Sequence, residues 1–305
     1  MKKAILFILL FLFVKLGAFS QNDPSFTQYM FNEVTFNPAA IEISNTLNAS
    51  LLARQQWVGF ENAPSTQVLN ASTYLQDIYG GVGLNIINDK MGYESFLTIR
   101  GFYAFPVQVG VLSHLTFGVG AGVVSRTLDG TGLTYEDPND PNAFYGRETF
   151  TRPDFNFGME YVDPNIKAGF AITHLYRSAK KAGIDYAPRH YYLYGKYRFR
   201  DVAEAIDIEP YLLLKSNMRS TQFDINVIGH YDDMVWAGFS YRLGDAVAAM
   251  LGYHITPNIR AGYAYDYSVG VNRPYSGGSH EIMIITRFDG FNSENATPRT
   301  PRIFN

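Results

Sequence analysis

The side chains with the most obvious capacity for chemistry are six histidines, spread along the chain at His114, His174, His190, His230, His254 and His280. None belongs to an HExxH zinc motif or accompanies a GxSxG nucleophile elbow. An enzyme needs a nucleophile beside a base, or ligands at metal spacing. The nearest approximation is His230 with Ser240, as in a barrel hydrolase. We favour histidines scattered through a lumen or an interface, and we expect no catalysis, no metal site and no cofactor.

Two further patterns suggest ligand binding, but their context argues against it. Gly118, Gly120 and Gly122 form a GxGxG sequence inside an alternating segment, whereas a dinucleotide fingerprint needs a helix directly after its strand. We interpret these glycines as places where a strand bends or where bulky neighbours fill a lumen. A group of oxygen ligands could hold calcium, but its spacing matches no EF-hand loop: Glu136, Asp137, Asn139 and Asp140. The chain has no cysteine, which excludes disulfides and thiolate chemistry.

The elements that must position these side chains are clearest between Thr221 and Arg242. Every second residue from Phe223 to Tyr231 is apolar or glycine, and most of the residues between them are polar. Asp232 and Asp233 then form a turn, after which the alternation resumes. A period of two on both sides of a short turn predicts a β-hairpin.

The same alternation predicts fourteen strands over most of the chain. An even number of strands, each about nine to eleven residues long, is typical of bacterial outer-membrane barrels. The predicted strands are Leu47–Arg54, Gln67–Leu75, Gly80–Asn88, Ser95–Phe105, Leu112–Ser125, Pro153–Tyr161, Ile166–Leu175, His190–Phe199, Ile208–Ser216, Thr221–Tyr231, Val235–Arg242, Ala246–Ile255, Ile259–Tyr267 and His280–Phe288.

The charged side chains decide which face of these strands points outward. A soluble sandwich shows the same alternation with its apolar face inside. Aromatic residues make up 15% of this chain and charged residues only 17%, which favours a membrane barrel with aromatic girdles. A Lys or Arg facing lipid at mid-depth costs about 2–4 kcal/mol, so we predict that the charged face lines the lumen. This face carries Arg54, Arg100, Glu160, Lys167, Lys196, Arg198, Glu209, Lys215, Asp224, Arg242, Arg260, Asp266 and Glu281.

The chain divides into four predicted segments. Residues 1–20 have the charged start, apolar run and small-residue end of a signal peptide. Residues 21–46 form a periplasmic N-terminal arm, residues 47–288 the barrel and residues 289–305 a C-terminal tail. Aromatic groups between Gln28 and Ala39 predict that the arm plugs or lines the lower lumen, because a periplasmic segment would not leave such apolar side chains exposed to water. Without the leader, the chain keeps 22 of its 25 basic side chains and all 28 acidic ones, so its formal net charge is −6. This charge argues against nucleic acid as a partner.

The lengths of the connections agree with this topology. Alternate connections lie on the same side of a membrane, and the long ones are extracellular. With a periplasmic N-terminus, the outer side receives the longest connections, 55–66, 126–152, 176–189 and 266–279. The opposite side receives short turns built from Asp, Asn and Pro. One inner connection, 200–207, is longer than expected.

Several motifs have no explanation in strand or turn rules, and together they resemble one known family. The motifs are Gln28-Tyr29-Met30-Phe31-Asn32, Phe36-Asn37-Pro38-Ala39, Arg54 to Phe60, Ala63 to Gln67, Gly80 to Leu84, Ser279 to Met283, and Pro301-Arg302. They are similar to those of the PorP/SprF family of the Bacteroidetes type IX secretion system, and the likeness covers nearly the whole mature chain. Tails in that family often carry a cysteine before the Pro-Arg step, where this chain has Thr300.

This resemblance implies a non-enzymatic barrel of the cell outer membrane that works with the secretion and gliding motility apparatus. The partners it implies are a secreted type IX cargo protein or surface adhesin, other subunits of the apparatus, and outer-membrane lipid. We expect the first outer loop to bind a partner or fold over the mouth, although Trp57 could equally be an interfacial girdle residue. A passive channel or hydrophobic-solute transporter is the alternative function. The candidate partner-binding residues are Arg54, Gln55, Gln56, Trp57, Phe60 and Pro64.

Overall fold

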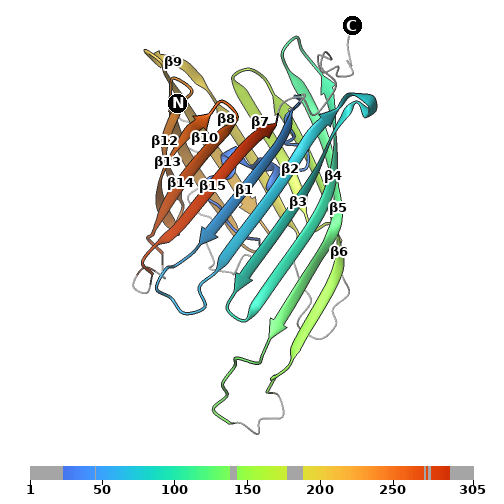
Figure 1. Ribbon diagram of the computed structural model, residues 1–305, viewed down its shortest axis with the longest axis vertical. Coiled ribbons are helices and arrows are strands. Elements are labelled where there is room, and N and C mark those ends of the chain that lie inside the picture. The colour runs from blue at the N-terminus through green and yellow to red at the C-terminus, as the bar shows by residue number, and fades with distance from the viewer. Residues whose placement is uncertain are drawn as a thin grey trace, which may run out of the picture.

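The computed structural model describes residues 23–44, 46–137, 143–176, 188–270, 273 and 276–288. These residues form one antiparallel barrel of tilted strands (Figure 1). The predicted signal peptide and C-terminal tail lie outside the described residues, as do Asn139 and Asp140 of the candidate calcium loop. No helix in the described part of the chain is both long and apolar enough to cross a bilayer.

The observed strands agree with the predicted ones to within a few residues at most ends, and the longest are β4, β5 and β6, with 15, 16 and 16 residues. Their bounds are β1 Leu47–Gln55, β2 Ser65–Leu75, β3 Gly80–Met91, β4 Glu94–Gln108, β5 His114–Asp129, β6 Arg147–Val162, β7 Ile166–Thr173, β8 His190–Tyr197, β9 Phe199–Ala203, β10 Ile206–Ser216, β11 Thr221–Tyr231, β12 Val235–Arg242, β13 Ala246–Thr256, β14 Ile259–Ser268 and β15 Ser279–Phe288.

The sheet closes on itself. Each strand pairs with its sequence neighbour, β10 pairs with both β8 and β11, and β15 returns to pair with β1. The strand β9 pairs only with β10 and continues the line of β8 beyond Arg198. The closed ring of the described residues therefore has fourteen strands, which confirms the predicted outer-membrane-type barrel. It also explains the long inner connection, because much of 200–207 belongs to a hairpin formed by β9 and β10.

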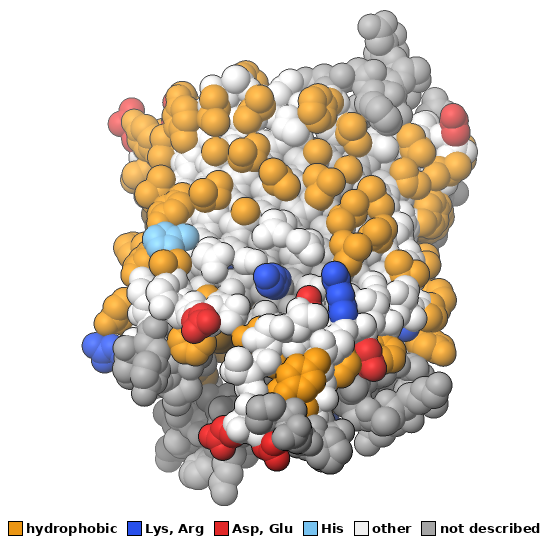
Figure 2. All heavy atoms as spheres, turned by 60° about the horizontal axis from the view of Figure 1, so that its bottom comes forward, with side chains coloured by type: hydrophobic (Ala, Val, Ile, Leu, Met, Phe, Trp, Pro, Cys, Tyr) orange, Lys and Arg blue, Asp and Glu red, His pale blue; other side chains and the backbone are white. Residues whose placement is uncertain are grey.

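The wall is sorted by face as the alternation predicts. On β12 the outward Phe239 is 71% exposed, while its neighbour Ser240 is 3% exposed and points inward. Nine of the thirteen charged residues predicted to face the lumen are buried there, and the other four line a cavity at one end of it. In Figure 2, hydrophobic side chains cover the upper wall, and Lys and Arg appear in the middle and lower parts of the view. This arrangement places hydrocarbon against hydrocarbon and keeps ionised groups away from lipid.

The connections differ between the two ends of the barrel. Residues 56–64, 130–146, 174–189 and 269–278 connect strands at one end, drawn at the bottom of Figure 1 and called the outer end here. The opposite, inner end has the short turns 163–165, 232–234 and 257–258. The longest connections thus all lie at the outer end, which agrees with the predicted parity, and the short turns 92–93, 217–220 and 243–245 lie there as well.

Candidate functional site

The lumen is occupied by residues 23–44, called the arm from here on. The arm contains two short 3₁₀ turns, η1 Tyr29–Phe31 and η2 Glu33–Thr35, and both lie inside the barrel (Figure 1). Its chain runs from Glu42, which pairs with Arg287 at the inner end, to Asp23, which contacts His174 at the outer end. The expectation that this segment fills the lumen is confirmed, and the arm reaches well beyond the lower half.

Aromatic side chains form the centre of the contact between arm and wall. Phe36 stacks on Tyr192 with ring centroids 4.8 Å apart, and Tyr29 meets the edge of Tyr211 at 5.3 Å. These four residues belong to one buried cluster that spans the lumen. The hydrophobic core of this protein therefore lies between the arm and the inward face of the barrel, where a water-filled porin would have its channel.

Glycines in the wall allow the arm backbone to come close. A Cβ atom at Gly118 would overlap the backbone of Pro38 and Ala39, and one at Gly158 would overlap the side chain of Asn37. Both glycines sit side by side in the register of β5 and β6. For Gly118, the interpretation of the GxGxG sequence as space for bulky neighbours is confirmed.

A buried carboxylate holds the first part of the arm. Glu281 on β15 accepts hydrogen bonds from the backbone N–H groups of Thr27 and Gln28, both at 2.8 Å. Arg54 on β1 lies between Glu281, at 3.1 Å, and Asp266, at 2.7 Å, and it also donates to Thr27 Oγ1. Since Arg54, Asp266 and Glu281 are at most 3% exposed, these charges interact where solvent screens them little.

Three of the sequence motifs meet at this carboxylate. The arm motif around Gln28, the β1 motif that begins at Arg54 and the β15 motif around Glu281 are far apart in the sequence, but Arg54 and Glu281 are register partners across β1 and β15. Residues of these three motifs thus connect the arm to the seam between β1 and β15, where the barrel closes. We call the contacts of Glu281 with Thr27, Gln28 and Arg54 the latch.

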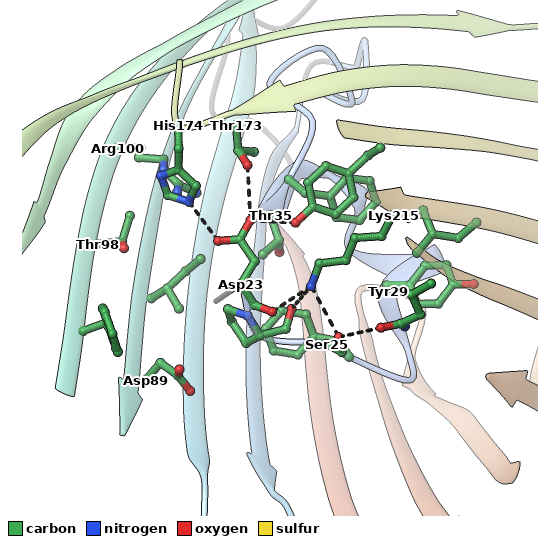
Figure 3. Close-up of a pocket in the computed structure, with 18 of the residues that line it drawn as sticks. Asp23, Ser25, Tyr29, Thr35, Asp89, Thr98, Arg100, Thr173, His174 and Lys215 are labelled. Carbon is green, nitrogen blue, oxygen red and sulfur yellow. Dashed lines mark hydrogen bonds and ion pairs between the residues drawn. The ribbon is translucent and has the colours of Figure 1, made fainter. Parts of the chain in front are cut away.

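A second polar cluster surrounds the beginning of the arm at Asp23 (Figure 3). One carboxylate oxygen of Asp23 lies 2.8 Å from His174 Nε2, and the other accepts hydrogen bonds from Tyr192 and Thr173. His174 Nδ1 lies 2.8 Å from Asp154, which in turn pairs with Arg100 at 2.6 Å. His174 is therefore held between two carboxylates.

The charges in this cluster shift the pKa values of its loop and arm members. Burial alone would raise the pKa of Asp23, but His190, His174 and Lys215 together hold it well below its ordinary value. Burial lowers the pKa of His174, and Asp23 and Asp154 outweigh this effect and raise it. Carboxylates only accept hydrogen bonds, so both ring nitrogens of His174 carry protons between these two partners.

Lys215 fixes the backbone at the same point. Its ammonium group donates to the carbonyl oxygens of Asp23, at 2.7 Å, and Pro24, at 3.3 Å, and lies 3.3 Å from Ser25 Oγ. Figure 3 shows Lys215 pointing across the lumen from the side opposite His174. The arm is thus clamped at the outer end from two sides of the barrel.

Two cavities remain on either side of the arm. The outer one has a volume of about 60 Å³ and is lined by residues that include Asp23, His174 and Lys215. The inner one is larger, about 440 Å³, and contains side chains of both signs, among them Glu33 and Arg260. The described part of the arm lies between them, which divides the lumen instead of leaving it open.

The predicted partner-binding residues fall into two groups. Arg54 and Pro64 are buried, and Arg54 belongs to the latch, so neither contributes to an exposed surface. Gln56 and Trp57 are half-buried, while Gln55 and Phe60 are exposed. The loop that carries them is fixed to the β14–β15 connection, because Val58 exchanges backbone hydrogen bonds with Gly277 and Gly278.

The hydrolase alternative has no geometric support. His230 pairs in register with Trp236, and Ser240 pairs with Asn226, four residues farther along the strand. At about 3.4 Å per residue this separates them by roughly 14 Å, too far for a nucleophile and its base.

The sequence model of the family described as "Type IX secretion system membrane protein PorP/SprF" matches residues 18–286 of this chain. Among solved structures, the outer membrane protein Omp33 of Acinetobacter baumannii is 8% identical, with 80% of this chain and 99% of that chain covered and a TM-score of 0.48. The CymD monoaromatic hydrocarbon channel is 11% identical, with coverages of 86% and 100% and a TM-score of 0.49. No curated protein matches the sequence.

Proposed function

This chain belongs to the PorP/SprF family of type IX secretion system membrane proteins, and from that premise we propose that it supports secretion or surface attachment of a partner protein. The protein is a β-barrel of the outer membrane. The proposed partner is a secreted cargo protein or surface adhesin at the outer end, with other subunits of the apparatus at the inner end. We propose no catalytic step for it.

The observation that carries this proposal is the filled lumen. The arm joins the wall through a buried aromatic cluster, the Glu281 latch and the Asp23 cluster. A channel or solute transporter needs a continuous path, and this arm separates the two cavities. Because the interior of this barrel is packed, only its outer loops and its two ends can contact other molecules. Such surfaces suit a protein that binds partner proteins.

Conductance in planar bilayers separates this function from the channel alternative. We expect the mature protein to give little or no current, and a variant that lacks residues 23–44 to give steady openings. Steady conductance from the intact protein, at the level of the arm-deleted variant, would contradict the proposal and favour a passive channel.

The loop 56–64 is the proposed contact for the cargo or adhesin at the outer end. Phe60 at its tip is 53% exposed and Val58 is 40% exposed, while the loop is held in place by the β14–β15 connection. Aromatic side chains that become buried against a partner are typical of binding hot spots. The other proposed contacts are the outer loop from Tyr135 to Phe150, of which residues 138–142 lie outside the described residues, and the loop around Tyr186, which also lies outside them.

Surface display of the partner tests this assignment. We expect Trp57→Ala combined with Phe60→Ala to reduce display of type IX cargo on intact cells at least fivefold, since truncation of a hot-spot residue to alanine costs about 2 kcal/mol or more. Met218→Ala is the matched control, because Met218 is 71% exposed on a different outer loop. Unchanged display in the double variant, with normal barrel insertion, would remove this loop from the mechanism.

A further inference from the structure

Three potential metal ligands converge at the outer end of the arm. A carboxylate oxygen of Asp23 and one ring nitrogen each of His174 and His190 lie within 4.8 Å of one another. They come from three places in the chain: the start of the arm, the residue after β7 and the first residue of β8. We propose that Asp23, His174 and His190 bind a divalent transition metal ion, with Zn²⁺ the best fit, which fastens the arm to the barrel wall.

The distances are compatible with a shared ion. Zinc binds nitrogen and carboxylate oxygen at about 2.0–2.2 Å, so ligand atoms in a tetrahedral site lie about 3.4 Å apart. Here His174 Nε2 is 2.8 Å from one carboxylate oxygen of Asp23, Oδ1, and His190 Nδ1 is 3.3 Å from the other, Oδ2. Small rotations of the two imidazoles would open the first contact and bring all three atoms to bonding distance. The ion would then take the place of the proton on His174 Nε2.

His190 is the observation that points most directly to a ligand. Its side chain is completely buried, and neither ring nitrogen makes a hydrogen bond of acceptable geometry within the described structure. The polar groups that act on this ring are the Asp23 carboxylate, the backbone carbonyl of Pro188, His174 and Lys215. Buried polar groups nearly always have a partner, because an unmet one costs about 1–3 kcal/mol. A metal ion bonded to this imidazole would supply the partner.

The second layer of contacts has the arrangement found around zinc ligands. A metal-bound histidine usually donates its other ring N–H to a carboxylate, which fixes the ring and raises its basicity. His174 meets this condition through Asp154, and Arg100 holds Asp154 in turn. Tyr192 donates to the Asp23 carboxylate at 2.7 Å and orients it. Figure 3 shows His174 directed at Asp23 from the barrel wall.

Space and charge at the site also suit an ion. The adjoining outer cavity, about 60 Å³, has room for a water molecule as a fourth ligand. Lys215 donates to the backbone carbonyls of Asp23 and Pro24 and not to the Asp23 carboxylate. The same cavity is lined by two further acids, Asp89 and Asp224, and by Arg100, which pairs with Asp154. Two imidazoles and one carboxylate favour zinc or a neighbouring transition metal over Ca²⁺ and Mg²⁺, which prefer oxygen ligands alone.

Metal titration of the mature protein, purified in detergent without a polyhistidine tag and stripped with a chelator, tests the site. With ZnCl₂ alone in the calorimeter, we expect one ion per chain, and with Co²⁺ the visible absorption of a low-coordinate nitrogen and oxygen site. His190→Ala should weaken zinc binding at least tenfold. The matched control His230→Ala removes a histidine at the inner cavity and should leave the affinity unchanged.

Asp23→Asn provides a second test that leaves the barrel wall intact and should also weaken binding at least tenfold. Heat-modifiable migration in gels confirms that each barrel is folded. A stoichiometry near zero, or equal affinities for the native protein and either ligand variant, would overturn the site and leave the cluster as a purely ionic clamp. The measurement involves neither secretion nor conductance, so its result is independent of the proposed function.

Discussion

Replacement of Glu281 by Gln should release the arm from the wall without disturbing the barrel. Glutamine has the same shape, but it can offer only one acceptor oxygen where Glu281 offers two. The carboxylate currently accepts the N–H groups of Thr27 and Gln28 and pairs with Arg54. In the variant an NH₂ group must face at least one of these donors.

The size of the effect follows from these contacts. A buried N–H that loses its acceptor costs about 1–3 kcal/mol, and hydrogen bonds to charged groups are stronger than neutral ones. Arg54 keeps its second carboxylate partner, Asp266, so the full penalty for breaking a buried ion pair does not apply. We expect the arm to be destabilised by about 2–4 kcal/mol, which corresponds to a roughly 30- to 900-fold larger population of the released state.

The absence of cysteine from the sequence gives a direct assay. Thr35 is 7% exposed in the middle of the arm, and Thr35→Cys introduces a single thiol that a maleimide reaches only when the arm leaves the lumen. The labelling rate in Glu281→Gln should rise by the factor given above. Glu61→Gln, in the exposed outer loop, is the control. Equal labelling rates in the Glu281 and Glu61 variants, with both barrels folded, would refute the assignment of this carboxylate as the latch.

Two further predictions concern the wall. Gly118→Val should push the arm away and raise the labelling rate of Thr35→Cys by roughly 5- to 150-fold, the equivalent of about 1–3 kcal/mol of overpacking. The control Gly101→Val points outward, where a Cβ meets only one distant carbonyl, and should not change the rate. Equal rates in the two variants would show that the arm does not need Gly118. Val227→Arg, on the lipid-facing side of β11, should destabilise the barrel in liposomes by about 2–4 kcal/mol in urea titrations. Val111→Arg in the 90% exposed β4–β5 turn should cost almost nothing, and equal losses at both positions would contradict the outward orientation of Val227.

Much of the barrel could be predicted from the sequence because its defining pattern is local. Alternation such as that of Phe223 to Tyr231 depends only on residues two apart, since successive side chains of a strand point to opposite faces. The charges along each strand then decided the inward face, and the observed burial of Asp224 beside the exposed Ile225 agrees. The aromatic residues of the arm indicated a segment that must be buried, so the filled lumen could also be predicted from the sequence.

The sites inside the lumen depend on contacts that no local pattern records. Arg54 and Glu281 are 227 residues apart, and only closure of the barrel makes them neighbours. Asp23 and His174 are separated by 151 positions, and the arm must pass through the whole lumen before they meet. A metal site on one helix or turn has a recognisable spacing, whereas these ligands have none, because three different segments supply them. The one available signal was that His174 and His190 flank the same outer connection.

The sequence by itself therefore determined the strand count, the orientation of each face and the presence of a plug, since each follows from periodicity and composition. The tertiary structure alone decided where the plug is held and which of the six histidines come together. The physical reason is that strand faces are set by neighbouring residues, while the latch and the Asp23 cluster exist only when the ring closes and the arm is threaded through it.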